Sequence, residues 1–335
     1  MVTLRYWNME NKDMENLRRE DMEQLSTTEW LSRVAKYSGQ RQYKAMYSSW
    51  VGGVVTNPAL MLIPIDDHMA HRGDAVFEAV RVTPRGPYLF DAHLQRLLSS
   101  AEKIDLKIPM GLNEIGSICR NLLDIAKIQH EGMLRIFVGR GFGDFSANPY
   151  STTGSQIYII AMDFASLAKE KYDKGVSLMI SKVPVKPGMY AQVKSCNYLP
   201  NVMTKKDAID NGYDFALNLT SEGFVTEGPT ENLLIVSSSG ELIAPKFDYT
   251  LRGTTLVRAM ELAEKFMREE ISDVRLADLH LDDLRQAREI MMVGTTLGIL
   301  PVTKFEKIQV GKGVPGSTTV KLRALVREDM GFKSE

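Results

Sequence analysis

One lysine differs from its neighbours in its surroundings. Lys194 lies in QVKSCNYLPNVMTKK, among small and apolar residues, at the junction of a predicted strand and a predicted helix. Pro200 is compatible with the first turn of that helix. A partly desolvated lysine loses its proton more readily and can form a Schiff base with an aldehyde. Taken alone, the segment is also typical of an ordinary surface lysine.

An acidic residue and two threonine-rich segments add further chemistry. Glu227 interrupts the apolar pattern of GFVTEGPTENLLIV, where a carboxylate can hold a proton on a pyridine nitrogen or simply belong to a turn. LRGTTLVRAM and MVGTTLGIL each place glycine, backbone N–H groups and hydroxyls at a predicted helix N-terminus or loop, which suits a phosphate dianion. Neither matches a Walker or dinucleotide-binding sequence.

Arg96 supplies a third kind of group. It lies in HLQRLLSSAEK, a predicted helix with an apolar opposite face, and its guanidinium could bind phosphate or simply face solvent. An amine for an aldehyde, an acid for a ring nitrogen and a phosphate site are together what pyridoxal 5′-phosphate requires.

With these residues in place, the sequence resembles the fold type IV pyridoxal-phosphate enzymes, which include branched-chain aminotransferases, D-amino acid transaminases and aminodeoxychorismate lyase. Six motifs occur in the order typical of the family, between about Tyr47 and Met330: HRGDAVFEAVRV, HLQRLLSSAEK, VKSCNYLPNVMTKKDA, VTEGPTENL, LRGTTLVR and VGTTLGILPV. The resemblance implies an α/β fold like that of D-amino acid aminotransferase, with an α+β N-terminal domain and a mixed α/β cofactor domain. It also implies a class IV aminotransferase that moves an amino group between an amino acid and a 2-oxo acid such as 2-oxoglutarate.

The resemblance also implies roles for individual residues. Lys194 would bind the cofactor aldehyde and then transfer the substrate α-proton, Glu227 would pair with the ring nitrogen, and Tyr198 would contact the ring oxygen. The cofactor phosphate would be bound by Arg96, Thr254, Thr255, Thr295 and Thr296.

The residues expected at the substrate disagree about specificity. Phe77, Glu78 and Arg81 fall in a segment that contributes to the family's substrate pocket, and Phe77 replaces the tyrosine of D-amino acid transaminases. Tyr198 matches the branched-chain pattern. Arg140, in FVGRGFGDFS, matches an arginine of D-amino acid transaminases and the lyase; it could bind a substrate carboxylate or be an exposed residue at a strand end.

Several functions therefore remain open at this stage. The favoured one is an aminotransferase acting on branched-chain L-amino acids or D-amino acids. An alternative is a lyase that keeps the cofactor and releases pyruvate and 4-aminobenzoate, and another is a non-catalytic binding protein that has kept the fold. The family's cleft is completed by a neighbouring subunit, so we expect at least a homodimer, with Trp50 and Tyr88 as candidate contact residues.

Three other groups of residues are interpreted as structural. The acidic and histidine residues of DDHMAH, at 66–71, are more typical of a turn and helix cap than of metal ligands. Cys196, beside Lys194, is interpreted as small-residue packing rather than a catalytic thiol. Met291 and Met292 are expected in the core. We therefore predict no metal site.

Composition limits the partners. The chain has 335 residues, with 41 basic and 42 acidic side chains and a formal net charge of −1, which does not favour nucleic acid or an anionic membrane as a partner. It has two cysteines and no apolar run of roughly 18 residues. We expect a soluble cytoplasmic protein with small-molecule substrates.

The pattern of elements predicts a helical N-terminal extension over 1–42, a smaller α+β domain over 43–165, a linker over 166–174 and a larger cofactor-binding domain over 175–335. The extension carries a predicted helix over NLRREDMEQLSTTEWLSRVAKY. Strands are predicted at ALMLIPI and FVTE, and EIMMVGTTLGILPV is predicted as strand, loop and short helix.

Overall fold

The computed structural model describes residues 23–36, 42–266 and 270–333, and the chain divides into two compact units, 1–41 and 42–335. The first unit contains α2 (Thr27–Ala35), whose N-terminus has a capping box of Ser26 and Glu29. The predicted N-terminal helix is shorter than expected, because residues 23–26 are not helical. Its predicted parts at 16–22 and 37 lie outside the described residues.

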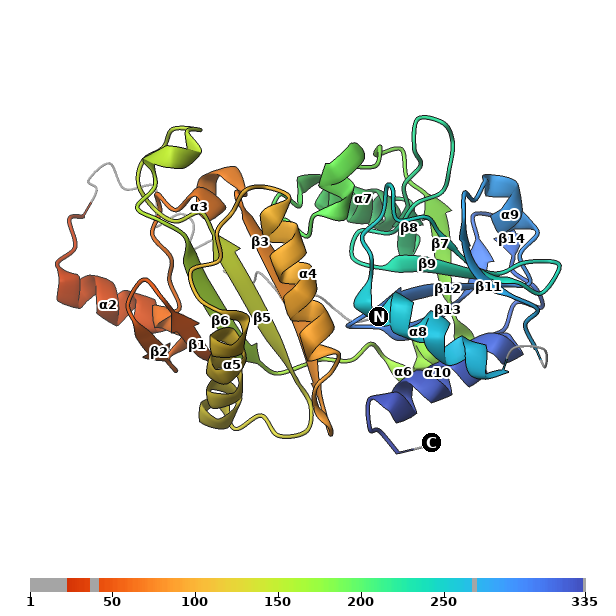
Figure 1. The fold of residues 1–335 in the computed structure, drawn as a ribbon, viewed down its shortest axis with the longest axis horizontal. Helices are drawn as coiled ribbons and strands as arrows, with labels where there is room; N and C mark the ends of the chain where they lie inside the picture. The colour runs from red at the N-terminus through yellow and green to blue at the C-terminus, as the bar shows by residue number, and fades with distance from the viewer. Residues whose placement is uncertain (1–22, 37–41, 267–269, 334–335) are drawn as a thin grey trace. The chain divides into compact units, whose positions relative to one another are not determined.

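The second unit begins with an antiparallel sheet of six strands, in the order β2-β1-β6-β5-β3-β4. The strands are β1 (Tyr43–Ser48), β2 (Gly53–Val55), β3 (Ala75–Thr83), β4 (Gly86–Pro87), β5 (Gly132–Gly139) and β6 (Gln156–Met162). Helices α4 (Phe90–Glu102) and α5 (Leu112–Ala126) lie against one face of this sheet, and the short α3 (His68–Arg72) precedes β3 (Figure 1). Leu94, Leu97 and Ala101 of α4 are buried at helical spacing, as their pattern predicts.

A second, mixed sheet of eight strands follows, in the order β11-β10-β9-β12-β13-β7-β8, with β14 beside β13. Its strands are β7 (Val176–Ile180), β8 (Phe215–Leu217), β9 (Asn232–Val236), β10 (Leu242–Pro245), β11 (Val274–Ala277), β12 (Glu289–Gly294), β13 (Gly298–Phe305) and β14 (Ile308–Gln309). The helices of this part are α6 (Lys169–Lys174), α7 (Leu199–Asp210), α8 (Thr254–Ala263), α9 (Leu281–Arg285) and α10 (Ser317–Asp329). Residues of β9 and β12 are buried in two separate apolar clusters, so this sheet is covered on both faces.

The elements predicted at ALMLIPI, FVTE and ILPV are wrong. ALMLIPI forms no strand, because Asn57 caps a 3-10 helix at Pro58–Leu60 instead. FVTE forms only an isolated bridge between Leu219 and Val225. ILPV belongs to the strand β13 rather than a short helix, since it pairs with β12 across a tight turn. Met291 and Met292 are fully buried, as expected.

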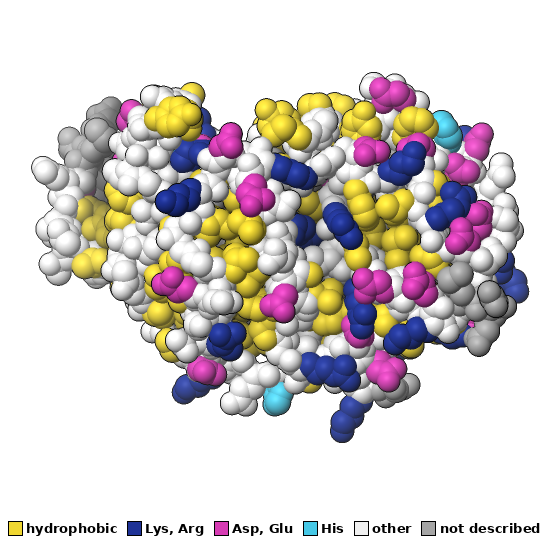
Figure 2. Space-filling view, in the orientation of Figure 1, with side chains coloured by type: hydrophobic (Ala, Val, Ile, Leu, Met, Phe, Trp, Pro, Cys, Tyr) yellow, Lys and Arg dark blue, Asp and Glu magenta, His cyan; other side chains and the backbone are white. Residues whose placement is uncertain are grey.

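Surface chemistry agrees with the balanced composition. Figure 2 shows basic and acidic side chains interspersed on the face drawn, rather than separated by sign. None of the helices in the described residues has the length and apolar character needed to cross a membrane.

Glu289 attaches α10 to the second sheet. This buried residue begins β12, and its carboxylate accepts hydrogen bonds from the backbone N–H groups of Thr318 (3.1 Å) and Thr319 (2.7 Å) and from the Thr319 hydroxyl (2.6 Å). A carboxylate at this position satisfies N–H groups of the first helical turn and interacts favourably with the helix dipole.

We predict that Glu289→Ala lowers the free energy of unfolding by about 2 to 3 kcal/mol, because buried N–H groups lose a charged acceptor. Urea unfolding followed by circular dichroism measures this change. Glu328→Ala, at an exposed position near the other end of α10, is the matched control and should change stability by less than about 0.5 kcal/mol. Equal stability of the two variants would contradict the proposed attachment.

Candidate active site

The predicted site residues meet at a cavity of about 170 Å³ lined by residues from both sheets. Of the predicted residues, the cavity is lined by Phe77, Arg96, Lys194, Tyr198, Thr254, Thr255, Thr295 and Thr296. A smaller adjoining cavity is lined by Glu227 together with Lys194 and Tyr198. Residues that are far apart in the sequence are thus brought to one place.

Lys194 is held against the edge of β3. Its carbonyl accepts a hydrogen bond from the Phe77 N–H (2.9 Å), and its own N–H donates to the Ser100 hydroxyl (3.2 Å). The residues before it form a 3-10 helix at Gly188–Gln192 rather than the predicted strand, whereas α7 begins after it with Pro200 in its first turn, as predicted.

The amine of Lys194 is set up for nucleophilic chemistry. Its Nζ lies 4.7 Å from the centre of the Phe77 ring. Burial lowers the pKa of Lys194 to about 8, and the positive charge of Arg96 acts in the same direction. About a tenth of this lysine is therefore neutral at pH 7, far more than of an ordinary lysine, and the neutral amine is the form that attacks a carbonyl carbon.

Glu227 is held by two hydrogen bonds to one of its oxygens. Its Oε2 accepts from the side-chain amide of Asn232 (2.8 Å) and from the Leu251 N–H (3.1 Å). Burial nevertheless raises the pKa of Glu227 to about 8. This carboxyl can therefore carry a proton in the cavity, or share one with a basic ring nitrogen.

The N-terminus of α8 forms one side of the cavity. Thr254 and Thr255 begin this helix, and the Thr255 hydroxyl oxygen is buried without a hydrogen-bond partner among the described residues. Gly253 precedes them because a Cβ there would lie 1.8 Å from the Asn232 side-chain oxygen. A buried hydroxyl beside a helix N-terminus suits a phosphate group.

The second threonine pair lies on a hairpin turn rather than at a helix N-terminus. The Leu297 N–H donates to the Gly294 carbonyl (3.1 Å), which closes the turn between β12 and β13. Thr295 and Thr296 are the central residues of that turn, and both line the cavity that Thr254 and Thr255 of α8 also line. The structure thus brings these residues together with the other predicted ones, although the expected helix is not present.

Arg96 is oriented by Glu78. Arg96 donates from Nε and Nη2 to the two oxygens of this fully buried carboxylate (2.7 and 2.8 Å), and from Nη1 to the Arg252 carbonyl (3.2 Å). Burial alone would raise the pKa of Glu78, but the charge and hydrogen bonds of Arg96, with a hydrogen bond from His93, lower it to about 2. Glu78 was expected in the substrate pocket, but it does not line the cavity. It contacts Arg96, which does.

His93 extends this network to α8. Its Nδ1 lies 2.7 Å from Glu78, and its Nε2 lies 3.1 Å from the Thr254 hydroxyl. Burial lowers the pKa of His93, which favours the neutral ring. Because the ionised Glu78 can only accept, Nδ1 donates to it, and Nε2 then accepts from Thr254.

Arg140 lies away from the cavity. Its guanidinium forms a bidentate pair with Asp74 (2.6 and 3.0 Å) and donates to the carbonyls of Ile104 and Asp105 (both 2.9 Å). The structure therefore does not bring Arg140 to the other site residues. Its hydrogen bonds hold the end of β5 against the loop after α4.

Two cationic residues at the site were missed by sequence reasoning. Arg135 lies on β5 opposite Ala79 of β3 and lines the main cavity, and burial lowers its pKa. Lys186 lines the adjoining cavity with Glu227, and burial lowers its pKa too. The signal for Arg135 was present, because it is a lone charge inside the apolar run MLRIFVG.

Three further expectations can be compared with the structure. Asp67 caps α3 by accepting from the Met69 N–H (2.9 Å), as the turn-and-cap interpretation predicts. Burial raises the pKa of Cys196 to about 12, which disfavours thiol catalysis. Tyr88 is buried and donates to Asp329 (2.7 Å), so it is not the exposed contact residue expected, whereas Trp50 is exposed.

Comparisons with known proteins decide the family. Residues 75–305 match the model of the family described as amino-transferase class IV. The chain belongs to the class IV aminotransferases. It is 34% identical to the chloroplastic D-amino-acid transaminase of Arabidopsis thaliana, over 91% of this chain and 82% of that protein. It is 29% identical to a putative branched-chain-amino-acid aminotransferase of Methanocaldococcus jannaschii, over 78% of this chain and 88% of that one.

A solved structure places this class IV aminotransferase in the expected fold. The crystal structure of the branched-chain amino acid aminotransferase of Escherichia coli is 26% identical, covers 85% of this chain and 93% of its own, and superposes with a TM-score of 0.77. The fold type IV architecture and the aminotransferase class predicted from the sequence are thereby confirmed.

We predict that the stability of the ligand-free protein falls as the pH rises from 5.5 to 7.5, and falls less in Glu227→Gln. Since the pKa of Glu227 is raised from 4.5 to about 8 in the folded state, its contribution is complete below pH 4.5 and is lost as the pH rises through 8. Between pH 5.5 and 7.5, the wild-type protein should lose more unfolding free energy than Glu227→Gln does, by on the order of 2 kcal/mol.

Urea unfolding at the two pH values tests this expectation. Glu264→Gln, which removes an exposed carboxylate near the end of α8, is the matched control and should follow the wild-type protein. Parallel pH dependence in wild-type and Glu227→Gln proteins would contradict the raised pKa.

Proposed function

We propose that this class IV aminotransferase binds pyridoxal 5′-phosphate in the main cavity and transfers amino groups between amino acids and 2-oxo acids. The observation that carries the proposal is the set of groups around this cavity: the amine of Lys194, the buried hydroxyl of Thr255 and the oriented guanidinium of Arg96. These fit an aldehyde and a phosphate, and Glu227 in the adjoining cavity fits a ring nitrogen.

The cofactor would supply an electron sink for the bond electrons released when the substrate loses its α-proton. The protein residues have separate tasks. Lys194 provides the amine that binds the aldehyde and later accepts and returns the α-proton, for which a pKa of about 8 is well matched to neutral pH. Glu227 would donate a proton to the ring nitrogen and pair with it as the carboxylate that remains, because burial raises the pKa of Glu227 to about 8 and this acid carries a proton near neutral pH before the cofactor binds.

Phosphate binding would combine two kinds of donor. Arg96 offers the positive charge and is fixed by Glu78 before any ligand arrives, so little side-chain entropy is lost on binding. The first turn of α8 and the turn at Thr295 and Thr296 offer hydroxyl and backbone N–H donors.

The substrate is proposed to lie between Phe77, Tyr198 and Arg135. Phe77 and Tyr198 stack edge to face, with ring centres 5.3 Å apart, and form an apolar wall. Arg135 is the cation on the same wall of the cavity and suits the substrate carboxylate, the role that was expected of Arg140. The similarity to transaminases named for D-amino acids and for branched-chain amino acids leaves both as candidate substrates.

We predict that Lys194→Ala abolishes covalent cofactor attachment and lowers the transamination rate by at least about 10³-fold, because no other lysine among the described residues lines the main cavity. Attachment is measured by borohydride reduction and peptide mass spectrometry. Lys205→Ala, on α7, is the matched control and should keep both.

The wild-type holoenzyme can also be used to identify the substrate. The holoenzyme is mixed with single L- and D-amino acids, and loss of the cofactor's visible absorbance reports the first half-reaction. Bleaching by one stereochemical series, with release of the matching 2-oxo acid, supports the proposal. Normal turnover by Lys194→Ala, or release of pyruvate and 4-aminobenzoate from aminodeoxychorismate over many turnovers without an amino acceptor, would refute it.

We also propose a homodimer formed through the β1–β2 hairpin. Trp50, Val51 and Val54 expose 44%, 56% and 40% of their surface there, which is an apolar group uncommon on a monomer. Light scattering should give twice the mass of the chain, and Val54→Lys should shift the mass toward that of one chain. A single-chain mass for the wild-type protein at micromolar concentration would contradict the dimer.

A further inference from the structure

A second cavity, of about 240 Å³, lies next to the candidate active site. On β3, Ala79 lines the first cavity and Arg81, two residues on and on the same side of the strand, lines the second. On the β12–β13 hairpin, Thr296 lines the first and Leu297 the second. The two cavities are therefore neighbours along the same pair of elements.

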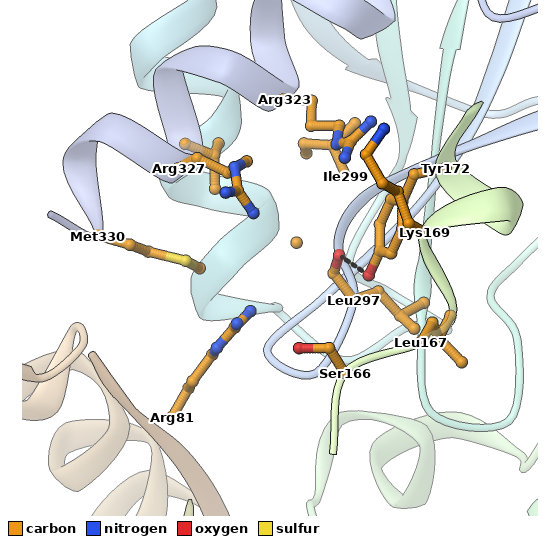
Figure 3. Close-up of a pocket in the computed structure, with 12 residues that line it drawn as sticks. Arg81, Ser166, Leu167, Lys169, Tyr172, Leu297, Ile299, Arg323, Arg327 and Met330 are labelled. Atoms are coloured by element: carbon orange, nitrogen blue, oxygen red, sulfur yellow. Dashed lines mark hydrogen bonds between the residues drawn. The ribbon is translucent and has the colours of Figure 1, made fainter. Parts of the chain in front are cut away.

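The second cavity is lined by cationic side chains. These are Arg81, Lys169, Arg323 and Arg327, and in the part of the chain that the structure describes no aspartate or glutamate lines it. Figure 3 shows the guanidinium groups of Arg81 and Arg327 pointing toward the middle of the cavity. Asp173 contacts Lys169 (2.9 Å) and Arg323 (4.0 Å) without lining the cavity.

Arg81 indicates that an anion belongs there. Its side chain is only 9% exposed, and its guanidinium carbon lies 4.3 Å from the centre of the Phe164 ring and 5.0 Å from that of Phe332. One Nη donates to Glu131 (2.7 Å), but the buried Nε has no hydrogen-bond partner among the described residues. A buried N–H of a charged group without an acceptor is costly, and a ligand oxygen would satisfy it.

The rest of the lining limits the size and chemistry of the ligand. Ser166 offers a hydroxyl, and the walls between the cations are aliphatic, made by Leu167, Leu297, Ile299, Val326 and Met330. Guanidinium groups bind carboxylate and phosphate oxygens in pairs. Several cations around a small cavity favour a ligand that carries more than one negative charge.

We propose that this second cavity binds a small oxyanion with two or more negative charges, such as a phosphate or a tricarboxylate. It is separate from the substrate site, since Arg81, Arg323 and Arg327 do not line the main cavity. Arg81 was expected in the substrate pocket, but it lines this second cavity instead.

The bound anion would also act on the active site, and this step rests on the proposed function. The Tyr172 hydroxyl donates to the Leu297 carbonyl (2.9 Å), and the Leu297 N–H closes the turn that carries Thr295 and Thr296. An anion held against Leu297 and Gly298 stabilises this turn in the form that binds the cofactor phosphate. Cofactor and anion then each strengthen the binding of the other.

Calorimetric titration of the holoenzyme tests the site, with citrate and inorganic phosphate as separate probes at low ionic strength. The cofactor's own phosphate occupies the main cavity, so the heat reports another site. We expect one equivalent of at least one probe to bind, with an affinity that falls on adding salt. Arg327→Gln and, independently, Arg323→Gln should each weaken binding about tenfold.

Arg285→Gln removes a cation from α9 and is the matched control, which should bind as the wild-type protein does. Thermal unfolding confirms that each variant is folded. No binding of either probe up to about 10 mM, or equal binding by Arg327→Gln, Arg323→Gln and Arg285→Gln, would overturn the site.

The coupling has its own readout. Cofactor release, followed by absorbance, should be slower when the bound probe is present, and this difference should vanish in Arg327→Gln. An unchanged release rate would overturn the coupling. Titration of Lys194→Ala with the same probe, in the presence of saturating cofactor so that the main cavity is filled, separates the two proposals, because the second cavity should still bind the anion when catalysis is lost.

Discussion

The arrangement of the active site depends on the buried carboxylate of Glu78. It accepts both hydrogen bonds of the Arg96 fork and one from His93, and these two residues in turn reach Arg252 and Thr254. Elements of the first sheet are thereby joined to the start of α8. A buried ion pair adds little net stability, because desolvation offsets the attraction, but removing one partner leaves an uncompensated charge. In this protein the ion pair of Glu78 and Arg96 fixes the orientation of the guanidinium group, so Arg96 presents its remaining donors in one direction only.

The pair of Lys194 and Glu227 shows how burial can set reactivity without an elaborate hydrogen-bond network. Burial disfavours charge on both groups, so it lowers the pKa of the amine and raises that of the carboxyl, each to about 8. The two groups border one small cavity, and the charge of each acts on the pKa of the other. Near neutral pH an amine can lose a proton and an acid can keep one, which are the two states that a carbonyl and a ring nitrogen require.

Sequence reasoning identified those cavity-lining residues that lie in short local motifs. Lys194 before a helix, Arg96 on an amphipathic helix, and glycine-threonine pairs can each be recognised from their immediate neighbours. It failed where the result depends on distant packing. Glu78 lies in a strand whose residues are all buried, so the alternation that would reveal which face it occupies is absent. Arg140 could be placed only by knowing that Asp74 and the loop after α4 lie beside it.

The same limit explains the wrong secondary structure at ILPV. A short apolar run is compatible with a buried strand or a buried helix, and only its pairing with β12 decides between them. That pairing is also what places Thr295 and Thr296 at the main cavity, since the turn is held by the two strands that flank it. The proposed phosphate site requires exposed N–H and hydroxyl donors, and a tight turn provides them as well as a helix N-terminus does.

One strand, β3, connects all of these features. Phe77, Ala79 and Arg81 face the two cavities, whereas Glu78 faces α4 and fixes Arg96. Because strand side chains alternate between faces, a slip of one residue in the pairing of β3 with β5 would exchange these roles at once. The register is held by eight consecutive paired residues and by the bridge between Val76 and Ser195 beside Lys194. The position of Lys194, the proposed nucleophile, and the orientation of Arg96, the proposed phosphate ligand, are therefore set by the same hydrogen-bonded strand.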